Sequence, residues 1–413
     1  MAVRVAPTAL EMAQFIRPGD ALVWGQGCDE PLTLIEALLT QRAGLGGVSA
    51  FAGSSFSSVL KPEHTDHISF RSMGANGSMR SLAKTGSLGI VPCHVGQIGR
   101  LISDRRIRCD VALVQISRPD ADGNHSYGVI NDYTRAAVTN ARVVVAEVNN
   151  QVPFTFCDVL LPGSETDYLL ETSRDLVSMP PGKIGDGDRA LARFAANYIG
   201  DGSILQLGIG AVPDAIAQLL VDRRDLGLHS SMAGDALVDF IEAGAMTNAI
   251  KRAWRGVSVT GALIGTRRLY EFAHRNKAIL LCNSSIAHDA AILGALPKLV
   301  SINSALEVDI TGQVNAEEIG GAYIGGTSGQ IDFVRGGSRS PGGRPTGYSA
   351  ARRVEPSRRP PVRPCDDGPL RNRRDRHRIW RSRTQEQDAD RTRRRHGHYH
   401  PLRFPRSPRT RGA

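Results

Sequence analysis

The sequence predicts an α/β fold with mostly parallel sheets, arranged as two domains and followed by a basic tail. Short apolar runs alternate with amphipathic segments of helical length along the first 335 residues. Several runs are hydrophobic on both faces, which is typical of parallel strands covered by helices. After residue 335 this periodicity stops, and arginine and proline dominate. The alternation predicts layered α/β domains, and its loss marks where a packed core ends.

Strands and helices are expected to follow one another through both domains. Strands are expected at residues 21–24, 111–116, 143–148, 204–207, 278–281 and 299–302. Helices are expected at residues 31–40, 189–198, 213–221, 236–243, 268–275 and 287–293. Each strand candidate is short, rich in Val, Ile, Leu and Ala, and bounded by turn residues. This order predicts repeated βαβ units.

A run rich in proline and glycine at residues 179–187 is the best candidate for a linker. We therefore expect an N-terminal domain at residues 1–182 and a C-terminal domain at residues 183–343, a length that suffices for two packed domains. Residues 344–413 form the tail. We expect it to be disordered, because it has too few apolar residues to offset the entropy of ordering.

The net charge of +10 comes from the end of the chain. Residues 336–413 hold 22 arginines, no lysine and seven acidic residues, a net charge of +15, so the preceding residues carry −5. Such a charge density favours nonspecific binding to phosphates of nucleic acid or of an anionic membrane. Aromatic residues are sparse there, and no known nucleic-acid-binding module appears.

Composition argues against several classes of protein. No stretch is long and apolar enough to span a bilayer, and residues 1–20 lack the pattern of a signal peptide. The six cysteines are scattered singly, so neither a zinc site nor a disulfide framework is indicated. We expect a cytoplasmic protein with reduced thiols, no metal, no permanently bound cofactor and no membrane partner.

The strongest local signal is a glycine turn between a strand and a helix. The expected strand 204–207 runs into Gly208 and Gly210, and a helix is expected to begin near Pro213. Glycine lets a backbone approach a ligand closely, and free N–H groups at a helix start suit an anion or a carbonyl oxygen. The alternative is a tight turn with no ligand. The segment lacks the lysine of a P-loop and the third glycine of GxGxxG.

Two further segments combine small and polar residues. Residues 226–235 hold His229, Ser231 and Asp235 between two expected helices, where either an active-site loop or an ordinary loop with a helix cap would lie. A serine and a histidine close in sequence do not make a triad, and the chain has no GxSxG motif. Residues 325–336 form a glycine loop followed by Asp332 and Arg335, for which a plain ion pair is the commoner interpretation.

Taken together and in this order, these segments resemble the acetyl-CoA hydrolase/transferase family, which includes the 4-hydroxybutyrate CoA-transferases. The resemblance extends over nearly all of residues 10–335. The segments that carry it are 25–31, 115–123, 146–153, 205–215, 302–314 and 329–336. It implies two similar α/β domains with the active site between them. The family assignment is specific, but the segments do not specify a substrate.

The resemblance implies an acyl-CoA:carboxylate CoA-transferase or an acetyl-CoA hydrolase. Family members pass CoA through an acyl-glutamyl anhydride and then a glutamyl-CoA thioester. The expected partners are an acyl-CoA, as substrate, and a small carboxylate, and we expect a homo-oligomer. The residues that the resemblance assigns to CoA and oxyanion binding are Gly208, Gly210, Ala211, Pro213, Gly325, Ser328 and Gly329.

Two positions depart from the family pattern. This chain has Ser231 where the family has its glutamate, so Ser231 is the expected catalytic position. A neutral hydroxyl needs a base to attack a thioester, and the sequence shows none, which puts exchange through glutamyl-CoA in question. Hydrolysis by a positioned water, or another acyl-CoA reaction, stays open. Ser328 replaces the first of two glycines before Gln330, which would narrow the thioester pocket.

The tail is the largest departure, because the family continues past residue 343 with further strands. With suitable codons, a one-base frame change turns residues 374–383 into Val-Thr-Val-Thr-Glu-Tyr-Gly-Val-Ala, which resembles a family segment. We interpret the tail as an out-of-frame reading that leaves the second domain incomplete, with an unpaired sheet edge, low stability and little turnover. The open alternatives are a glutamate-independent hydrolase, an inactive truncated member, and a protein that binds nucleic acid or other anions through its tail.

Overall fold

Two parallel sheets organise the part of the chain that the structure describes. The computed structural model describes residues 2–308, 314–319, 322–323 and 325–349. The predicted α/β class with mostly parallel sheets is confirmed. The expected tail lies outside the described residues from residue 350 onward, so its disorder and its out-of-frame origin stay predictions.

The N-terminal half forms an eight-stranded sheet in the order β1-β10-β8-β6-β2-β3-β4-β5, and all neighbouring pairs are parallel. The strands are β1 (Val3–Val5), β2 (Ala21–Trp24), β3 (Val48–Phe51), β4 (Ile68–Ser72), β5 (Leu88–Ile90), β6 (Val111–Ile116), β8 (Val143–Asn149) and β10 (Tyr168–Thr172). The helices are α1 (Leu32–Gln41), α2 (Met79–Lys84), α3 (Val95–Ser103) and α4 (Thr134–Asn140). A short antiparallel pair joins β7 (Asn124–His125) to β9 (Leu161–Pro162).

Alternation along β2 explains how helices cover both faces of this sheet. Leu22 and Trp24 belong to the core cluster that contains α1, whereas Val23 belongs to the cluster that contains α3 and α4. All four residues of β2 are buried, as the two-sided apolar run predicts. Each large apolar side chain buried in this way stabilises the fold by about 1.5–3 kcal/mol.

The C-terminal half forms a six-stranded parallel sheet in the order β14-β13-β12-β11-β15-β20. The strands are β11 (Ile204–Leu207), β12 (Gly227–Ala233), β13 (Ser258–Leu263), β14 (Ile279–Leu281), β15 (Leu299–Ala305) and β20 (Arg344–Ser349). The helices are α5 (Asp186–Ala196), α6 (Ala211–Gln218), α7 (Ala236–Glu242), α8 (Arg267–Ala273), α9 (Ser284–Ala287), α10 (Ala290–Ala295) and α11 (Gln330–Arg339). Two antiparallel pairs join β16 (Glu307–Val308) to β17 (Val314–Asn315) and β18 (Glu318–Ile319) to β19 (Ala322–Tyr323).

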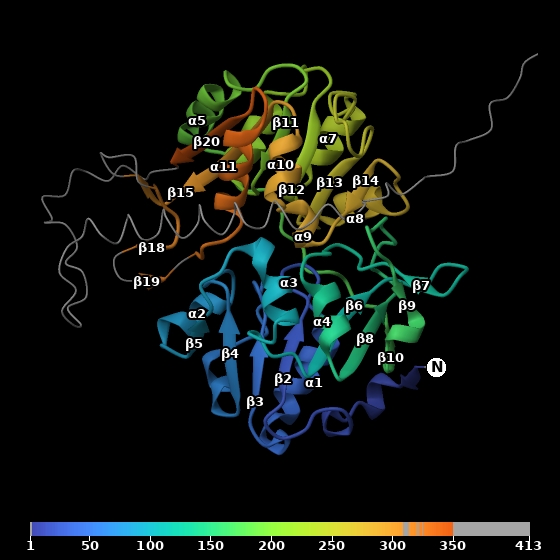
Figure 1. The fold of residues 1–413 in the computed structure, drawn as a ribbon. Coiled ribbons are helices and arrows are strands. Elements are labelled where there is room, and N and C mark those ends of the chain that lie inside the picture. Colours follow the sequence, from blue (N-terminus) through green and yellow to red (C-terminus); the bar gives the residue numbers. More distant parts are fainter. Residues whose placement is uncertain (1, 309–313, 320–321, 324, 350–413) are drawn as a thin grey trace, which may run out of the picture. The chain divides into compact units, whose positions relative to one another are not determined.

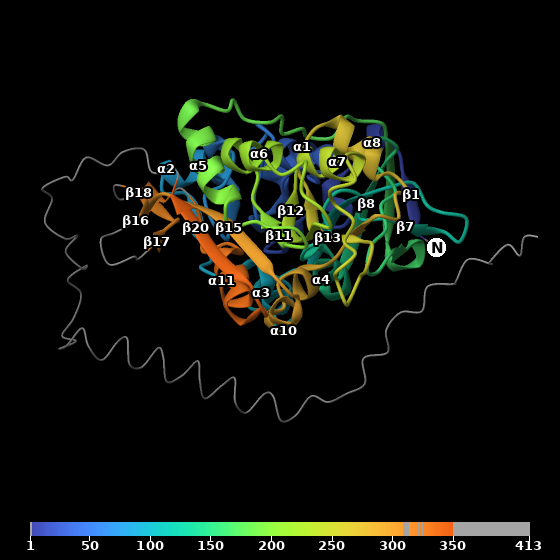
Figure 2. The same cartoon turned by 90° about the horizontal axis from the view of Figure 1, so that it is seen from above.

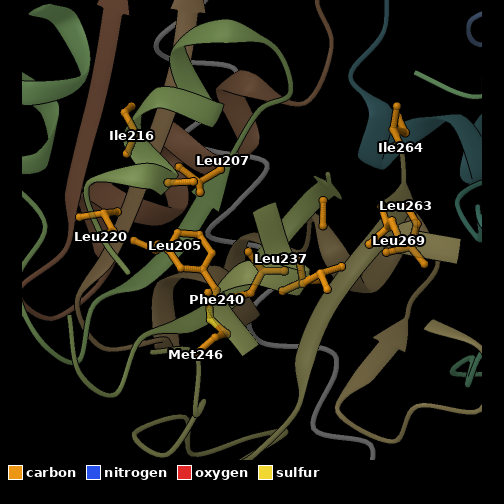
Figure 3. Packing of buried hydrophobic residues seen from close by; sticks show 14 of the residues in the cluster. Leu205, Leu207, Ile216, Leu220, Leu237, Phe240, Met246, Leu263, Ile264 and Leu269 are labelled. Atoms are coloured by element: carbon orange, nitrogen blue, oxygen red, sulfur yellow. The ribbon is translucent and has the colours of Figure 1, made fainter. Parts of the chain in front are cut away.

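Helices also cover both faces of the second sheet. Figure 2 shows α5, α6, α7 and α8 on one side of it and α10 and α11 on the other. The larger core lies under α6, α7 and α8, and Figure 3 shows its side chains from close by. The labelled core residues are Leu205, Leu207, Ile216, Leu220, Leu237, Phe240, Met246, Leu263, Ile264 and Leu269.

Three segments of the second half differ from what the sequence predicts or add to it. Residues 226–235 were expected to be a loop, but most of them form the buried strand β12, because pairing with β11 and β13 overrides the weak strand propensity of their serines. The segment that contains Asp332, for which no regular element was expected, is the helix α11. The expected helix at residues 287–293 is split into α9 and α10, because the Asp289 side chain accepts hydrogen bonds from Ala291 and Ile292 and starts a new helix.

The segments that precede and follow the second half have different structures. Residues 173–185 contain neither helix nor strand and connect β10 to α5, where the linker was expected. At the other end, β20 pairs in parallel with β15 from Arg344 to Ser349. The described sheet therefore extends past residue 343, the expected end of the domain, by one strand.

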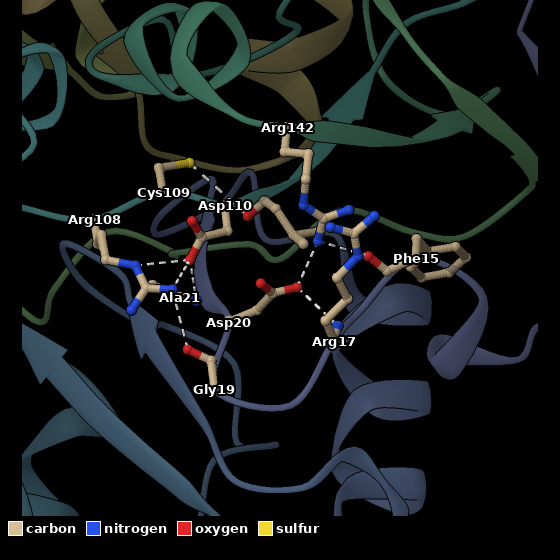
Figure 4. Close-up of polar contacts among 10 residues, drawn as sticks. Phe15, Arg17, Gly19, Asp20, Ala21, Arg108, Cys109, Asp110 and Arg142 are labelled. Atoms are coloured by element: carbon tan, nitrogen blue, oxygen red, sulfur yellow. Dashed lines mark hydrogen bonds and ion pairs between the residues drawn. The ribbon is translucent and has the colours of Figure 1, made fainter.

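The amino ends of three strands in the first sheet carry a network of charged residues (Figure 4). Asp20 precedes β2 and accepts hydrogen bonds from the Arg17 backbone N–H at 2.7 Å and from Arg142, which precedes β8, at 2.6 Å. Asp110 precedes β6 and accepts from the Ala21 N–H at 2.8 Å and from the Arg108 guanidinium at 2.9 Å. These bonds tie the starts of β2, β6 and β8 together.

Candidate active site

A cavity of about 580 Å³ lies between the two halves. Its walls come from segments that follow the carboxyl ends of β2, β3 and β4 in the first sheet and of β11 and β14 in the second. In parallel α/β sheets, ligands bind outside the carboxyl ends of the strands. Helices α3 and α9 contact each other where the halves meet (Figure 1). The cavity has a suitable size for a small-molecule site.

Ser231 lies in β12 and lines this cavity. Its Oγ is 2.9 Å from Nε2 of His288, a residue that also lines the cavity. His288 occupies the break between α9 and α10, and its side chain is only 2% exposed. A ring nitrogen, a group of the chemical type that activates a serine and for which the sequence gave no candidate, therefore lies within hydrogen-bonding distance of Ser231, 57 residues further along the chain.

The other ring nitrogen of His288 contacts a carboxylate. Nδ1 lies 3.1 Å from Oδ2 of Asp332, which is on the first turn of α11. A carboxylate only accepts hydrogen bonds, so the proton belongs on Nδ1 and is donated to Asp332. This tautomer leaves Nε2 free to accept the hydrogen of the Ser231 hydroxyl. Three residues from β12, the α9–α10 break and α11 thus form a serine–histidine–aspartate chain at the cavity wall.

Two glycines and a phenylalanine pack around the His288 ring. A Cβ on Gly329 would lie 2.3 Å from Cε1 of the ring, and a Cβ on Gly96 would lie 2.9 Å from the His288 Cβ. The Phe333 ring meets the imidazole edge-on, with 5.0 Å between ring centroids. The ring therefore has little room to turn away from Ser231 and Asp332.

The structure brings together some of the residues that the resemblance assigned and leaves others apart. Gly208, Ser328 and Gly329 line the same cavity as Ser231. Gly210 has a φ of +111°, which a residue with a side chain rarely adopts, and it immediately precedes α6. Ala211 and Pro213 lie in the first turn of α6 and are not among the residues that line the cavity.

Gly325 contributes to the junction of the two halves. Its carbonyl accepts a hydrogen bond from the Ala75 N–H at 2.9 Å, and the next residue, Gly326, bridges to Gly74. A Cβ on Gly74 would lie 2.4 Å from the Gly325 oxygen, and one on Gly326 would lie 2.6 Å from the oxygen of Met73. Backbone packed this closely accounts for the glycines at these positions.

The cavity also holds one carboxylate and one cation from the first half. Asp132 accepts a hydrogen bond from the Gln26 side chain, and burial raises the pKa of its carboxyl group. Arg80 on α2 is exposed at the edge of the cavity. On the opposite wall, Gln206 accepts hydrogen bonds from Ser301 at 2.6 Å and from Asn303 at 3.1 Å. The polar groups of the site thus come from both sheets.

His229 and Asp235 lie in the same segment as Ser231, residues 226–235, and make structural contacts. His229 is fully buried, its ring centroid lies 5.8 Å from that of Trp254, and burial lowers its pKa to about 3. Asp235 makes no side-chain cap for α7; its carboxylate accepts hydrogen bonds from the N–H and hydroxyl of Thr266. Neither residue supplies the partner of Ser231.

The described residues also bear on metal binding, membrane insertion and disulfide formation. Those residues contain no group of three or more His, Cys, Asp or Glu that could hold a metal ion. No helix within them has the length and apolar character needed to cross a membrane. The five cysteines in this part of the chain are free thiols.

Two parallel α/β sheets with a cavity at their strand ends are the architecture of this part of the chain. The chain belongs to the acetyl-CoA hydrolase/transferase family. The N-terminal domain of that family matches residues 4–181, and its C-terminal domain matches residues 265–358. The family predicted from the sequence is thus confirmed.

Relatives of known activity and known structure agree with this assignment. The chain is 34% identical to the 4-hydroxybutyrate coenzyme A transferase of Clostridium kluyveri, over 82% of this chain and 79% of the relative. It is 31% identical to the succinyl-CoA:cyclohexane-1-carboxylate CoA transferase of Geobacter metallireducens, over 81% and 77%. Its structure is similar to RipA from Yersinia pestis, with a TM-score of 0.78, 30% identity and coverage of 84% and 81%. It is also similar to the 4-hydroxybutyrate CoA-transferase of Porphyromonas gingivalis, with a TM-score of 0.69, 31% identity and coverage of 83% and 79%.

Proposed function

We propose that this chain cleaves acyl-CoA thioesters in the cavity between its two halves and passes the acyl group to water. The observation that carries the proposal is the position of Ser231, which lines the cavity together with Gly208 and Gly329. The Clostridium kluyveri and Geobacter metallireducens relatives are CoA-transferases, which supports an acyl-CoA substrate. The cleavage step is shared by transferases and hydrolases of the family.

The chemistry of a serine favours hydrolysis over exchange of CoA. In the family mechanism the enzyme holds CoA as a thioester of a glutamate side chain, which requires an acyl carbon at the nucleophile position. Ser231 has no acyl carbon, so its oxygen accepts the acyl group but cannot bind CoA as a thioester. Water is the simplest acceptor for an acyl group that remains after CoA has left.

The walls of the cavity offer places for the other parts of an acyl-CoA. Gly208 and Ile209 follow β11 and line the cavity, and their N–H groups are the candidate donors to the thioester oxygen. The guanidinium of Arg80 is the candidate partner for a phosphate of CoA, because it is exposed at the cavity edge. Both assignments follow from position and chemistry.

A direct test measures release of the CoA thiol from acetyl-CoA and butyryl-CoA by the purified full chain, with and without added acetate. We expect release that does not depend on acetate. Exchange that requires acetate would contradict hydrolysis and would point to a carboxylate nucleophile, for which Asp132 is the candidate within the cavity. Absence of thiol release with both substrates would contradict the proposal as a whole.

A pair of glycine variants tests whether the reaction takes place in this cavity. Gly208→Val places a side chain in the cavity wall, and we expect it to raise the KM for acetyl-CoA by about tenfold, because the valine takes up space that the substrate would occupy. Gly200→Val is the matched control, because a Cβ there meets no atom within 4 Å and the residue does not line the cavity. Equal KM values for the two variants would place the reaction elsewhere.

The substitution Ser231→Glu tests the chemical argument about the acceptor. It supplies the acyl carbon that the family resemblance places at this position, and we expect acetate-dependent transfer of CoA from butyryl-CoA to appear. Ser285→Glu introduces the same residue at an exposed position of α9 outside the cavity and should leave the acceptor preference unchanged. Transfer that stays absent in Ser231→Glu would contradict the view that the missing carboxylate decides between the two reactions.

We also propose that the protein is cytoplasmic. Five free cysteines in the described part fit the reducing cytoplasm, where structural disulfides are rare. Association of several copies stays a prediction, as does nucleic-acid binding by residues 350–413, which lie outside the described residues.

A further inference from the structure

We infer that Ser231 is an activated nucleophile that carries the acyl group as an ester, with His288 as its general base and Asp332 as the residue that positions the histidine. The inference rests on the proposed cleavage of acyl-CoA and names the residues that perform it. In this inference a serine takes the place of the carboxylate nucleophile of the family, and the covalent intermediate is an acyl ester of Ser231.

The geometry of the three side chains carries the inference. The Ser231 Oγ to His288 Nε2 distance is 2.9 Å and the His288 Nδ1 to Asp332 Oδ2 distance is 3.1 Å. A nucleophile within about 2.6–3.2 Å of a base, which is in turn oriented by a third group, is the arrangement found in serine hydrolases. The relay is recognised by these roles and distances rather than by the order of the residues in the chain.

The surroundings distinguish this chain of contacts from an ordinary buried hydrogen bond. Ser231 and His288 both line the cavity, so the hydroxyl is reachable by a substrate that enters it. Asp332 lies behind the histidine, with its side chain 15% exposed. Gly96 and Gly329 leave room for the imidazole, and any side chain at Gly329 would collide with it. The serine thus faces the open space while the other two residues are held in place.

The reaction balances with water as the only co-reactant. The Ser231 oxygen attacks the thioester carbonyl carbon while His288 Nε2 takes the hydroxyl proton. The carbon–sulfur bond breaks, and the CoA sulfur leaves with the proton from His288, which gives free CoA and an ester on Ser231. A water molecule then attacks this ester while His288 removes a proton from it. The carboxylic acid leaves, and the proton returns to the Ser231 oxygen.

Labelling with a fluorophosphonate probe tests the activated serine without any assumption about the substrate. The probe reacts with nucleophilic serines and loses fluoride. We expect it to label Ser231 in the wild-type chain and to label neither Ser231→Ala nor His288→Gln. Ser230→Ala is the matched control, because this neighbouring hydroxyl contacts the Leu207 carbonyl and does not line the cavity, and the control should be labelled.

Kinetic measurements on the same variants separate catalysis from folding. We expect Ser231→Ala to lower kcat for acetyl-CoA by about 10³-fold or more, with a thermal midpoint and a Kd for CoA close to those of the wild type. Asp332→Asn should lower kcat by about 10²–10⁴-fold and leave KM nearly unchanged, because it alters the tautomer of His288 and not the binding of CoA. A merely structural Asp332 would instead change the thermal midpoint and leave kcat intact.

The outcomes distinguish failure of the inference from failure of the proposed function. If the wild-type chain cleaves acetyl-CoA but Ser231→Ala cleaves it equally fast, or if labelling does not depend on His288, the relay is overturned and thioester cleavage stands. If the chain neither binds CoA nor cleaves thioesters, yet the probe labels Ser231 in a His288-dependent manner, the proposed substrate fails and the activated serine stands. Loss of labelling and cleavage in Ser231→Ala, with CoA binding retained, supports both.

Discussion

The two ends of the first sheet carry polar residues of similar kinds in very different surroundings. At the amino ends, Asp20 is bonded to Arg142 and Asp110 to Arg108, and both carboxylates also accept backbone N–H groups (Figure 4). Asp132, near the carboxyl ends, is bonded to Gln26 and lines the cavity. The amino-end residues hold strands together, whereas those at the carboxyl ends face space that a substrate enters.

In this protein, strand direction therefore separates structural polar residues from catalytic ones. Both sheets are parallel, so the carboxyl ends of all strands of a sheet lie along one edge. The Ser231–His288–Asp332 chain lies at the edge of the second sheet that faces the cavity. Variants at the two ends of the strands should therefore change different properties: stability at the amino ends and turnover at the carboxyl ends.

Among variants that keep all three side chains of the Ser231–His288–Asp332 chain, the largest effect is expected from Gly329→Ala at the carboxyl end. The backbone φ of −94° suits alanine, so the expected consequence comes from the collision of the new methyl group with the His288 ring. A displacement of about 1 Å in a catalytic group costs roughly 10²-fold in rate, and we expect kcat for thioester cleavage to fall by about that factor. Gly187→Ala, near the start of α5 with no atom within 4 Å of its Cβ, is the matched control. Unchanged turnover in Gly329→Ala would contradict the role of a fixed His288 ring.

At the amino end, Asp20→Ala should lower stability and spare activity. The substitution leaves the Arg17 N–H and the Arg142 guanidinium without their acceptor, which costs about 2–3 kcal/mol for a charged, largely buried group. Urea unfolding measures this loss, and kcat should stay at the wild-type value. Asp66→Ala, which removes the partner of Arg42 in an exposed pair, should give a much smaller change. A fall in kcat with no loss of stability in Asp20→Ala would reverse the comparison.

Lys251 is a further polar residue that we expect to affect stability rather than turnover. It is a buried lysine that has no carboxylate partner among the described residues. Its Nζ donates to the carbonyls of Leu228 and Val257, and burial lowers its pKa to about 7. Above pH 7 the folded chain has lost this proton while the unfolded chain keeps it up to its ordinary pKa, so stability rises with pH in this range.

We expect the unfolding free energy to increase by about 1–2 kcal/mol between about pH 7.5 and 9 through Lys251, and the variant Lys251→Met to lack this increase. Urea unfolding at several pH values gives both curves, and the difference between them isolates this residue from other titrating groups. Parallel curves for the two proteins would show that the folded chain does not perturb the lysine.

The smallest effect is expected from Ser328→Gly at the cavity. Ser328 has a φ of +45°, which is unfavourable for a residue with a side chain, and the family has glycine there. We expect the substitution to raise the unfolding free energy by about 0.5–1 kcal/mol. Ser338→Gly, in the last turn of α11, should lower it slightly, because glycine loses more backbone entropy than serine on forming a helix. The same sign for both variants would contradict strain at Ser328.

The sequence predicted much of the fold because buried parallel strands have an unmistakable pattern. The runs at β2, β6 and β11 are apolar on both faces and bounded by turns, and their predicted limits match the structure. The strand β12 was missed because serine, histidine and glycine are poor strand formers, and only pairing with two neighbours makes this segment a strand. Local propensity alone carries no information about such pairing.

The catalytic relay was only partly predictable. The family resemblance singled out Ser231, but His288 was hidden inside an expected helix at residues 287–293. The sequence signal for this site is Asp289 before an apolar run, a helix-start pattern that predicts a break at His288. For Asp332 the sequence favours an ion pair with Arg335, whereas in the structure its carboxylate contacts His288. The distances that join the three residues depend on the tertiary fold.

The site of acylation tests the central claim most directly. The full chain is mixed with acetyl-CoA, the reaction is stopped in acid within its first turnover, and the peptides are mapped by mass spectrometry. The account predicts one acetyl group on Ser231 in the wild-type chain and none in Ser231→Ala. An acetyl group on a carboxylate such as Asp132, with Ser231 unmodified, would contradict it.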